Sequence, residues 1–395
     1  MSKLSLSLVA IALLTTAATA DISSKSFGGS ASLFYGTNDA NDGDFFNKGQ
    51  SYGNAAINFA GVANVGNCDT CVTLNYGLTG VTTMGLEGTL VGGTWINHTL
   101  DDAIWIDTLN LTFSPLDGIS NTTMVLGRQA LDTPMVFTET WNIAQNTFDA
   151  AVVVNNDIQD TTLVGAWVGR SNNAGSGTAL TVNATDGFSD NSFDPFLTDE
   201  GAYAFGAVTT LIPAVTAQGW YYVAPSTANV AWLQADTEYA GFGLGAQYAM
   251  LDGDDDSDGT AYAVKLGYAY EGLGLSVAYS SVDEMTGTSA ALGFKNLGND
   301  QSKLYTEAWW NFDHVAESDT DSLNVTAEYS LDGIADLGVY YTNADHATAA
   351  DMSEITVTAG KDLGNLNLSL AYINTDIDGA ADAQNDVQVY AVYSF

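Results

Sequence analysis

The sequence predicts an all-β chain that closes into a transmembrane antiparallel β-barrel of about 18 strands. Three observations predict it: many segments alternate apolar and polar side chains, these segments end in aromatic residues, and their connections alternate between short and long. The 19 Tyr, 16 Phe, 8 Trp and 40 Gly against 5 Pro suit many short strands. After residue 20, no apolar run of about 18 residues is present, so helices that span a membrane are not expected.

The first twenty residues have the pattern of a secretory signal peptide. Lys3 supplies a positive charge, residues 4–14 are apolar, and Ala18-Thr19-Ala20 is a cleavage motif. We therefore expect a signal peptide at 1–20 and an exported chain that begins at Asp21. No linker-like segment divides residues 21–395, so these form one barrel domain.

The last strand, 385–395, shows the alternation most clearly. Its two faces carry Val387, Val389, Ala391, Tyr393 and Phe395 on one side and Asp386, Gln388, Tyr390 and Ser394 on the other. Because side chains alternate across a strand, we expect the first set to face lipid and the second to face the lumen.

The strand count rests on the alternation of short and long connections and on parity. With both termini at the same end of the barrel, the number of strands must be even. We expect strands at 27–36, 71–79, 83–92, 104–113, 121–128, 148–155, 161–170, 201–209, 216–223, 228–238, 241–250, 260–270, 273–282, 322–330, 335–343, 353–361, 365–374 and 385–395. Two further strand-like pieces, 54–63 and 303–311, are assigned to long loops. Counting both as strands would give about 20, and we take about 16 to 20 as the range.

The charge is strongly negative. Nine Lys and Arg stand against 47 Asp and Glu, a net charge of -38. Such a chain repels nucleic acid, which we exclude as a partner, and attracts cations. Surface solubility is the alternative explanation. A barrel of this size encloses water rather than a packed core, so its lumen is expected to admit small hydrophilic solutes.

The two cysteines form a Cys68-Asp-Thr-Cys71 motif. In an exported chain this spacing favours a local disulfide between Cys68 and Cys71. A free or redox-active pair is the alternative.

Two segments resemble a known family. Residues 126–134 read LGRQALDTP, and residues 146–156 read NTFDAAVVVNN. They are similar to the GRQ and NTF segments of OprD-like outer-membrane porins, and most similar to the major porins of Campylobacter-type bacteria. The terminal Phe395 agrees with outer-membrane barrels in general.

The resemblance implies an 18-stranded barrel in the outer membrane, a homotrimer, and a third extracellular loop that folds inward, here 129–147. It also implies a calcium ion in the pore of some members. The row of lumen arginines of basic-amino-acid or anion transporters is absent, since Arg128 and Arg170 are the only arginines. The resemblance thus supports the channel rather than an amino-acid substrate, and the Cys68/Cys71 pair lies outside the family pattern.

Candidate functional residues fall into two groups of charged side chains. Arg128, Asp132, Glu139 and Asp149 lie in or beside the third loop and would form the pore constriction, because carboxylates in a narrow passage concentrate cations. Loop carboxylates in bulk water, and an Arg128 that braces the fold through an ion pair, are the alternatives. Asp236, Glu238 and Glu328 alternate with apolar residues and are expected to face the lumen.

Acidic residues also crowd the segment 251–259. Taking Asp254 as position 1 of an EF-hand places Asp256 and Asp258 at positions 3 and 5, but position 12 is Lys265, where a Glu is needed. A weak calcium site at Asp254, Asp256 and Asp258 is one interpretation, and a solvated loop is the favoured one. No cofactor is expected to be required.

Together these patterns predict a passive, cation-preferring outer-membrane porin rather than an enzyme. The three histidines, His98, His314 and His346, are scattered in the sequence, and no catalytic motif is present. Expected partners are outer-membrane lipid, solutes and cations, two further copies of the chain, and the barrel-assembly machinery through Phe395. A plugged barrel with an adhesive or structural role is the alternative function, and conductance separates the two.

Overall fold

The computed structural model describes residues 22–40, 43–66, 72–92, 102–141, 143–172, 193–297, 299–347 and 349–395. The predicted signal peptide, both cysteines of the predicted disulfide, and His98 lie outside these residues.

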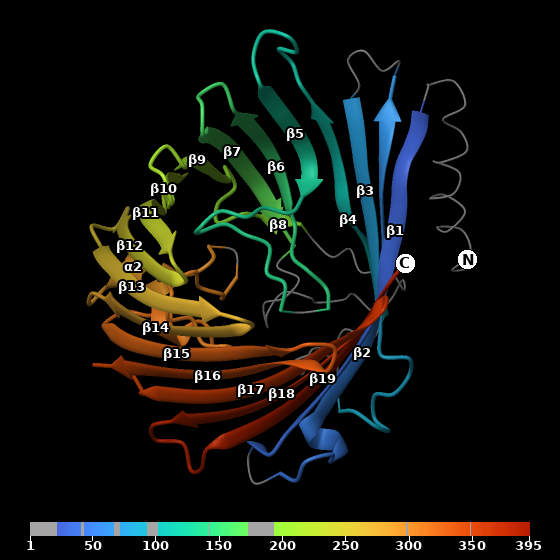
Figure 1. Cartoon of the computed structure of the whole chain (residues 1–395), viewed down its shortest axis with the longest axis vertical. Coiled ribbons are helices and arrows are strands. Elements are labelled where there is room, and N and C mark those ends of the chain that lie inside the picture. Colours follow the sequence, from blue (N-terminus) through green and yellow to red (C-terminus); the bar gives the residue numbers. More distant parts are fainter. Residues whose placement is uncertain are drawn as a thin grey trace.

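The described strands form a single antiparallel sheet that closes on itself (Figure 1). The short piece β8 pairs only with the last two residues of β7, and β7 otherwise pairs with β9, which leaves 18 strands in the wall. The strands are β1 (Ile22–Asn38), β2 (Ser51–Val65), β3 (Val72–Thr82), β4 (Asp102–Phe113), β5 (Thr122–Gln129), β6 (Phe148–Asn155), β7 (Thr161–Ser171), β8 (Asp194–Pro195), β9 (Ala202–Thr209), β10 (Val215–Ala224), β11 (Ala228–Tyr239), β12 (Phe242–Gly253), β13 (Asp258–Tyr270), β14 (Leu273–Val282), β15 (Thr320–Leu331), β16 (Ala335–His346), β17 (Met352–Leu363), β18 (Leu366–Ile377) and β19 (Gln384–Ser394). The predicted fold class and strand number are confirmed.

The ring closes where β1 lies beside β19, at the meeting of the blue and red ends of the chain in Figure 1. Their register runs from Ser30 opposite Ser394 to Asn38 opposite Asp386. The terminal residue continues the pairing, because Phe395 and Gly29 exchange two backbone hydrogen bonds of 2.9 Å. Closure leaves neither of these strands with an unpaired edge.

One end of the barrel carries the short connections, and we call it the turn end. The turns 240–241 and 271–272 join adjacent strands with only two residues each. Both residues of each turn have positive φ: 52° and 85° at Ala240 and Gly241, and 43° and 83° at Glu271 and Gly272. Such turns match the right-handed twist of paired strands, and a glycine at the second position removes the steric penalty there.

The opposite end, the loop end, carries the longer connections. Loop 3 (130–147) joins β5 to β6, and loop 7 (283–319) joins β14 to β15. The helices that lie wholly among the described residues are short: α2 (Gly287–Leu292), η2 (Lys48–Gln50) and η4 (His314–Ala316). None of the helices in the described ranges is long and apolar enough to cross a membrane.

The outer face of the wall is apolar. Exposed Leu and Val side chains form a band around the strands: Leu244, Val264, Leu266, Leu275, Val277, Val325, Val339, Val357 and Leu370. Exposed aromatic residues flank this band on both sides. They are Phe242, Tyr268, Tyr329 and Tyr393 toward the turn end, and Tyr248, Tyr262, Tyr279, Tyr341 and Tyr372 toward the loop end. A soluble protein would leave this much apolar surface in water, whereas a bilayer solvates it.

Two predictions for individual segments are wrong. One predicted loop is a strand and one predicted strand is not, so the total number of strands is unchanged. The sequence predicts a loop at 54–63, but these residues belong to β2, which pairs with β1 along its whole length. The sequence predicts a strand at 83–92, but these residues form turns, with positive φ at Met84, Gly85 and Gly88. The expectation that 303–311 lies in a long loop is confirmed.

Candidate functional site: the constricted lumen

The lumen of the barrel is narrowed by loops 3 and 7, which fold inward. Figure 1 shows the green segment after β5 crossing the interior of the ring. Met135 and Val136 of loop 3 and Phe294 of loop 7 are almost fully buried. The predicted inward-folded third loop is therefore confirmed, and loop 7 accompanies it.

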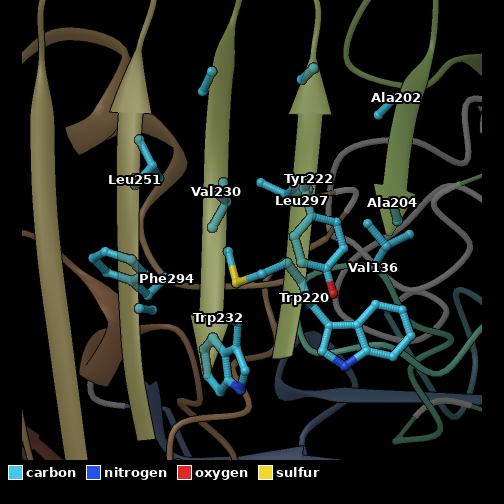
Figure 2. Close-up of a cluster of buried hydrophobic side chains, with 14 of the residues drawn as sticks. Val136, Ala202, Ala204, Trp220, Tyr222, Val230, Trp232, Leu251, Phe294 and Leu297 are labelled. Atoms are coloured by element: carbon cyan, nitrogen blue, oxygen red, sulfur yellow. Dashed lines mark hydrogen bonds between the residues drawn. The ribbon is translucent and has the colours of Figure 1, made fainter. Parts of the chain in front are cut away.

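An apolar cluster fixes both loops against one side of the wall. The cluster joins aromatic side chains of the wall to apolar side chains of both loops. Figure 2 shows Trp220, Tyr222 and Trp232 of β10 and β11 together with Val136 of loop 3 and Phe294 and Leu297 of loop 7. Trp232 and Phe294 have 0% exposure. Burying such large side chains stabilises a structure by roughly 1.5–3 kcal/mol each, so this side of the lumen is filled rather than open.

Loop 7 continues along the inner wall and is held there by inward-facing polar side chains. The side-chain amide of Gln247 of β12 makes two hydrogen bonds to the loop 7 backbone. It donates to the Lys303 carbonyl at 2.8 Å and accepts from the Tyr305 N–H at 3.1 Å. Glu354 of β17 accepts from the N–H groups of Trp310 (3.0 Å) and Asn311 (2.8 Å). The segment 301–312 thus lines the wall instead of hanging into the lumen.

Glu139 joins the two loops. Its carboxylate accepts hydrogen bonds from Trp141 Nε1 (2.7 Å) in loop 3 and from Asn296 Nδ2 (3.0 Å) and the Gln301 N–H (2.9 Å) in loop 7. The residue is only 2% exposed. Burial raises the pKa of Glu139, while these three donors favour its charged form. Its geometry is that of a brace between loops.

Asp132 is paired across the same two loops. It forms an ion pair with Lys303 of loop 7, and its side chain remains 88% exposed. Lys303 also lies 4.5 Å from the ring centre of Phe137. An exposed ion pair adds little stability, but it places one negative and one positive charge at the edge of the passage.

Arg128 and Asp149 form a bidentate pair between β5 and β6. Arg128 Nε lies 2.8 Å and Nη2 3.0 Å from the two carboxylate oxygens. The two residues are opposite each other in the strand register. They lie on the outer face of the wall, which they share with the exposed Leu109, whereas the buried Phe148 and Ala150 lie on the inner face. This arrangement corresponds to the bracing alternative for Arg128, with a strand carboxylate as its partner.

The passage that remains open lies beside the apolar cluster, and Leu304 and Tyr305 of loop 7 border both. Its central part is a cavity of about 910 Å³ bounded by loop 3, the loop 7 segment 301–310 and the walls. Two further cavities, of about 400 and 420 Å³, extend it toward the turn end. Glu328 lines all three cavities, so it stands where they meet. Its carboxylate accepts a hydrogen bond from the Tyr340 hydroxyl at 2.8 Å.

The other two strand carboxylates also border the passage. Asp236 and Glu238 line the third cavity together with Lys265. Asp236 accepts a hydrogen bond of 2.5 Å from the hydroxyl of Tyr305 in loop 7. Lys265 lies 5.7 Å from the Tyr305 ring centre. Tyr305 therefore stands between an acidic and a basic side chain of the wall.

Sequence reasoning missed Glu307, the most perturbed carboxyl group of loop 7. It lines the central cavity, yet one of its oxygens is buried without a hydrogen-bond partner among the described residues. Burial raises the pKa of Glu307 to about 8. The group is therefore largely neutral at pH 7, and it gains charge only as the pH rises.

The acidic segment after β12 forms a tight turn. Within it, Asp255 accepts a hydrogen bond from the N–H of Thr288 at 2.9 Å and so connects the turn to α2. Asp254, Asp256 and Asp258 surround this contact in sequence. Calcium binding by these three residues stays a prediction.

The fold and the site define a class of protein. A closed antiparallel barrel with an apolar outer band, two aromatic girdles and a polar passage is a transmembrane barrel of the outer-membrane type. In that class the turn end faces the periplasm and the loop end faces the outside.

Solved structures narrow this class to one fold. The chain is similar to OccK3 (OpdO) of Pseudomonas aeruginosa, with 14% identity, a TM-score of 0.66, and coverage of 94% of this chain and 96% of that chain. It is similar to Pseudomonas aeruginosa OccK2 (OpdF), solved in complex with glucuronate, with 12% identity, a TM-score of 0.69, and coverage of 95% and 98%. It is also similar to OccAB4 of Acinetobacter baumannii, with 10% identity, a TM-score of 0.69, and coverage of 93% of this chain and 97% of that chain.

These neighbours are porins of the OccK/OprD family, and the likeness shows that this barrel has the OprD-like porin fold. No protein-family model and no curated protein matches the sequence. The neighbours come from Pseudomonas and Acinetobacter and do not support the more specific resemblance to Campylobacter-type porins.

Proposed function

We propose that this chain is an outer-membrane porin through which small hydrophilic solutes diffuse passively, with a preference for cations. The observation that carries the proposal is the set of three cavities inside a closed barrel that share Glu328 in their lining. A passage beside the folded loops gives solutes a route that a filled lumen lacks.

The charges along this passage support the cation preference. Besides Glu307, the carboxylates that line the cavities are Asp236, Glu238, Glu328 and Asp336, and the basic side chains are Lys265 and Lys303. Low-dielectric walls strengthen the field of such charges on a passing ion. We assign the selectivity chiefly to Glu328, Asp236 and Glu238, with Asp132 acting at the loop end.

The roles of the four constriction candidates differ in this proposal. Asp132 is exposed enough to act on ions directly, although Lys303 offsets part of its charge. Glu139 acts indirectly by holding loop 3 to loop 7. Arg128 and Asp149 neutralise each other and stabilise the wall beside loop 3.

The substrate class follows from the same lining. The OccK2 structure holds glucuronate, an anionic sugar acid. The residues that line the three cavities here include two lysines and no arginine, so an anionic solute finds few partners among them. We propose neutral and cationic small solutes as the preferred cargo.

Several finer expectations stay predictions alongside this proposal. They are the kinship with Campylobacter-type porins, the homotrimer, recognition of Phe395 by the barrel-assembly machinery, and a weak calcium site. The tie between Phe395 and Gly29 supports a role for the terminal residue in closing the barrel.

The test is a planar-bilayer measurement on the detergent-folded chain. We expect stepwise conductance and, across a KCl gradient, a reversal potential of the sign that marks K⁺ permeation. Steps with anion preference would keep the porin and refute the assignment of selectivity to the carboxylates. A well-folded barrel without conductance would favour the plugged, adhesive alternative.

A further inference from the structure

Two histidines that are 32 positions apart in sequence meet at the loop end of the barrel, together with a glutamate. One imidazole nitrogen each from His314 and His346 and one carboxylate oxygen of Glu317 lie within 4.8 Å of one another. The two rings are 5.9 Å apart at their centres and nearly perpendicular. His346 Nδ1 lies 3.9 Å from Glu317 Oε2.

The last part of loop 7 fixes two of these residues. His314 and Glu317 are three positions apart across η4, and side chains at that spacing lie on the same side of a 3-10 turn. Between them, Val315 and Ala316 are fully buried. Val315 packs against Ala344 and Met352 of the wall, so the turn is anchored to β16 and β17.

Strand β16 places the third residue. His346 ends this strand, and its N–H donates to Asp351 Oδ1 at 2.7 Å. The next residue, Ala347, donates to the carbonyl of Asp319 at 3.1 Å, which ties the end of β16 to the end of loop 7. The three side chains therefore converge on a backbone frame that packing and hydrogen bonds already define.

The hydrogen bonds of His346 suggest its protonation state. Its Nδ1 is 2.8 Å from the hydroxyl of Thr320, which also lies 3.3 Å from the Ser318 carbonyl. We assign the hydrogen of the imidazole to Nδ1, because a Thr320 hydroxyl that donates its one proton to the Ser318 carbonyl then accepts from this nitrogen. The other nitrogen, Nε2, is then an acceptor; it is buried and has no hydrogen-bond partner among the described residues.

A neutral imidazole with one nitrogen held and the other free is typical of a metal ligand. Without a metal, the buried free nitrogen lowers the stability of the fold. A buried acceptor without a partner costs about 1–3 kcal/mol. Histidines that bind metals are usually neutral, with one ring nitrogen held by a neighbouring group. The side chain of His346 is 0% exposed, so bulk water does not satisfy its free nitrogen.

The donor set selects the kind of metal. Two imidazole nitrogens and one carboxylate suit Zn²⁺ and other late first-row divalent ions, whereas Ca²⁺ and Mg²⁺ prefer oxygen ligands. Tetrahedral Zn²⁺ ligands lie about 3.4 Å apart at bond lengths near 2.1 Å, so ligand atoms that lie within 4.8 Å of one another need to close by up to about 1.4 Å. Asp345 and Asp351 add negative charge close to His346.

We propose that His314, Glu317 and His346 form a binding site for one divalent transition-metal ion such as Zn²⁺, with the remaining coordination position open to water. The bound ion links loop 7 to β16. None of the three residues lines the three lumen cavities, so the site is separate from the carboxylates assigned to selectivity, and it stands whether or not the barrel conducts.

The test is titration of the untagged, chelator-treated full chain in detergent with Co²⁺, whose visible absorption reports tetrahedral coordination. We expect saturation at one Co²⁺ per chain and displacement by Zn²⁺ but not by Ca²⁺. Glu317→Gln and His314→Ala should each weaken binding at least tenfold. The matched controls are His98→Ala, which removes the third histidine of the chain, and Asp332→Asn at the turn end, and neither should change the affinity.

Glu317→Gln keeps the test decisive, because its side chain is 41% exposed and its loss leaves no buried cavity. The proposal would be overturned by the absence of a saturable Co²⁺ signal in the folded wild-type barrel. It would also be overturned by an affinity that is unchanged in both ligand variants, or by equal weakening in His98→Ala.

Discussion

Replacing Glu328 by Gln is the sharpest perturbation of the passage. The change removes one negative charge at the junction of the three cavities and keeps the size of the side chain. The amide oxygen of Gln can still accept the hydrogen bond from Tyr340, so the wall is expected to keep its shape. Any change in ion selectivity then reports the charge itself.

The expected magnitude follows from Coulomb's law. A cation that passes about 5 Å from the carboxylate in water gains about 0.8 kcal/mol. At 0.15 M salt the Debye length of about 8 Å reduces this to about 0.4 kcal/mol, which corresponds to roughly a twofold change in the permeability of K⁺ alone. In 1 M salt, with a Debye length of about 3 Å, the effect should almost vanish.

Lys265→Met is the matched control of opposite sign, because Lys265 shares two of the cavities with Glu328. Reversal potentials across KCl gradients at low and high salt measure both variants. Because the charge acts with opposite sign on K⁺ and Cl⁻, Glu328→Gln should lower the K⁺/Cl⁻ permeability ratio about fourfold, and Lys265→Met should raise it by a similar factor. Unchanged selectivity of Glu328→Gln at low salt, or shifts of the two variants in the same direction, would refute the reasoning.

Three further changes test the loops and the barrel seam. Glu139→Ala leaves three donors of loops 3 and 7 without their acceptor, at about 1–3 kcal/mol for each group that stays buried; single-channel recordings should show more open-channel noise than in Glu139→Gln. Because the pKa of Glu307 is raised from 4.5 to about 8, its contribution to stability is present below pH 4.5 and is lost as the pH rises toward 8. Thermal unfolding followed from pH 5 to 9 should show this decline in the wild type and not in Glu307→Gln, and equal curves would contradict the burial argument. Deleting Phe395 removes two backbone hydrogen bonds to Gly29, each worth about 0.5–1.5 kcal/mol, and should lower the yield of folded barrel in refolding assays, whereas Phe395→Tyr should fold normally.

The sequence was sufficient to predict most strands of the barrel wall, because a membrane barrel repeats one simple rule. Each strand alternates lipid-facing and lumen-facing side chains, so Val387 and Asp386 reveal their faces without knowledge of any distant residue. The rule weakens where the side chains are small. In β2 the inward Ala56 and the outward Ala55 are both alanine and do little to mark a face, so the sequence predicts a loop where the structure has this strand. In 83–92 the apolar residues suggested a strand, but glycines with positive φ bend the chain.

The site was harder to predict from the sequence than the wall, because it depends on contacts between residues far apart in sequence. The sequence predicts Glu139 in the constriction from its place in loop 3, but two of its three hydrogen-bond donors lie more than 150 residues later. Nothing in one sequence indicates that 301–312 follows the inner wall, and hence that Glu307 and Lys303 border the passage. The meeting of His314 with His346 was missed for the same reason.

The net charge of -38 therefore overstates the charge that a solute meets inside the barrel. Many inward carboxylates are occupied in hydrogen bonds: Glu354 accepts from the loop 7 backbone, and Asp386 accepts from Tyr52 at 3.1 Å. Glu307, with its pKa near 8, adds little charge at pH 7. The field in the passage comes from the few carboxylates that remain open to water, partly balanced by two lysines. Cation preference should accordingly be moderate and sensitive to salt, since each of these charges acts through water over several ångströms.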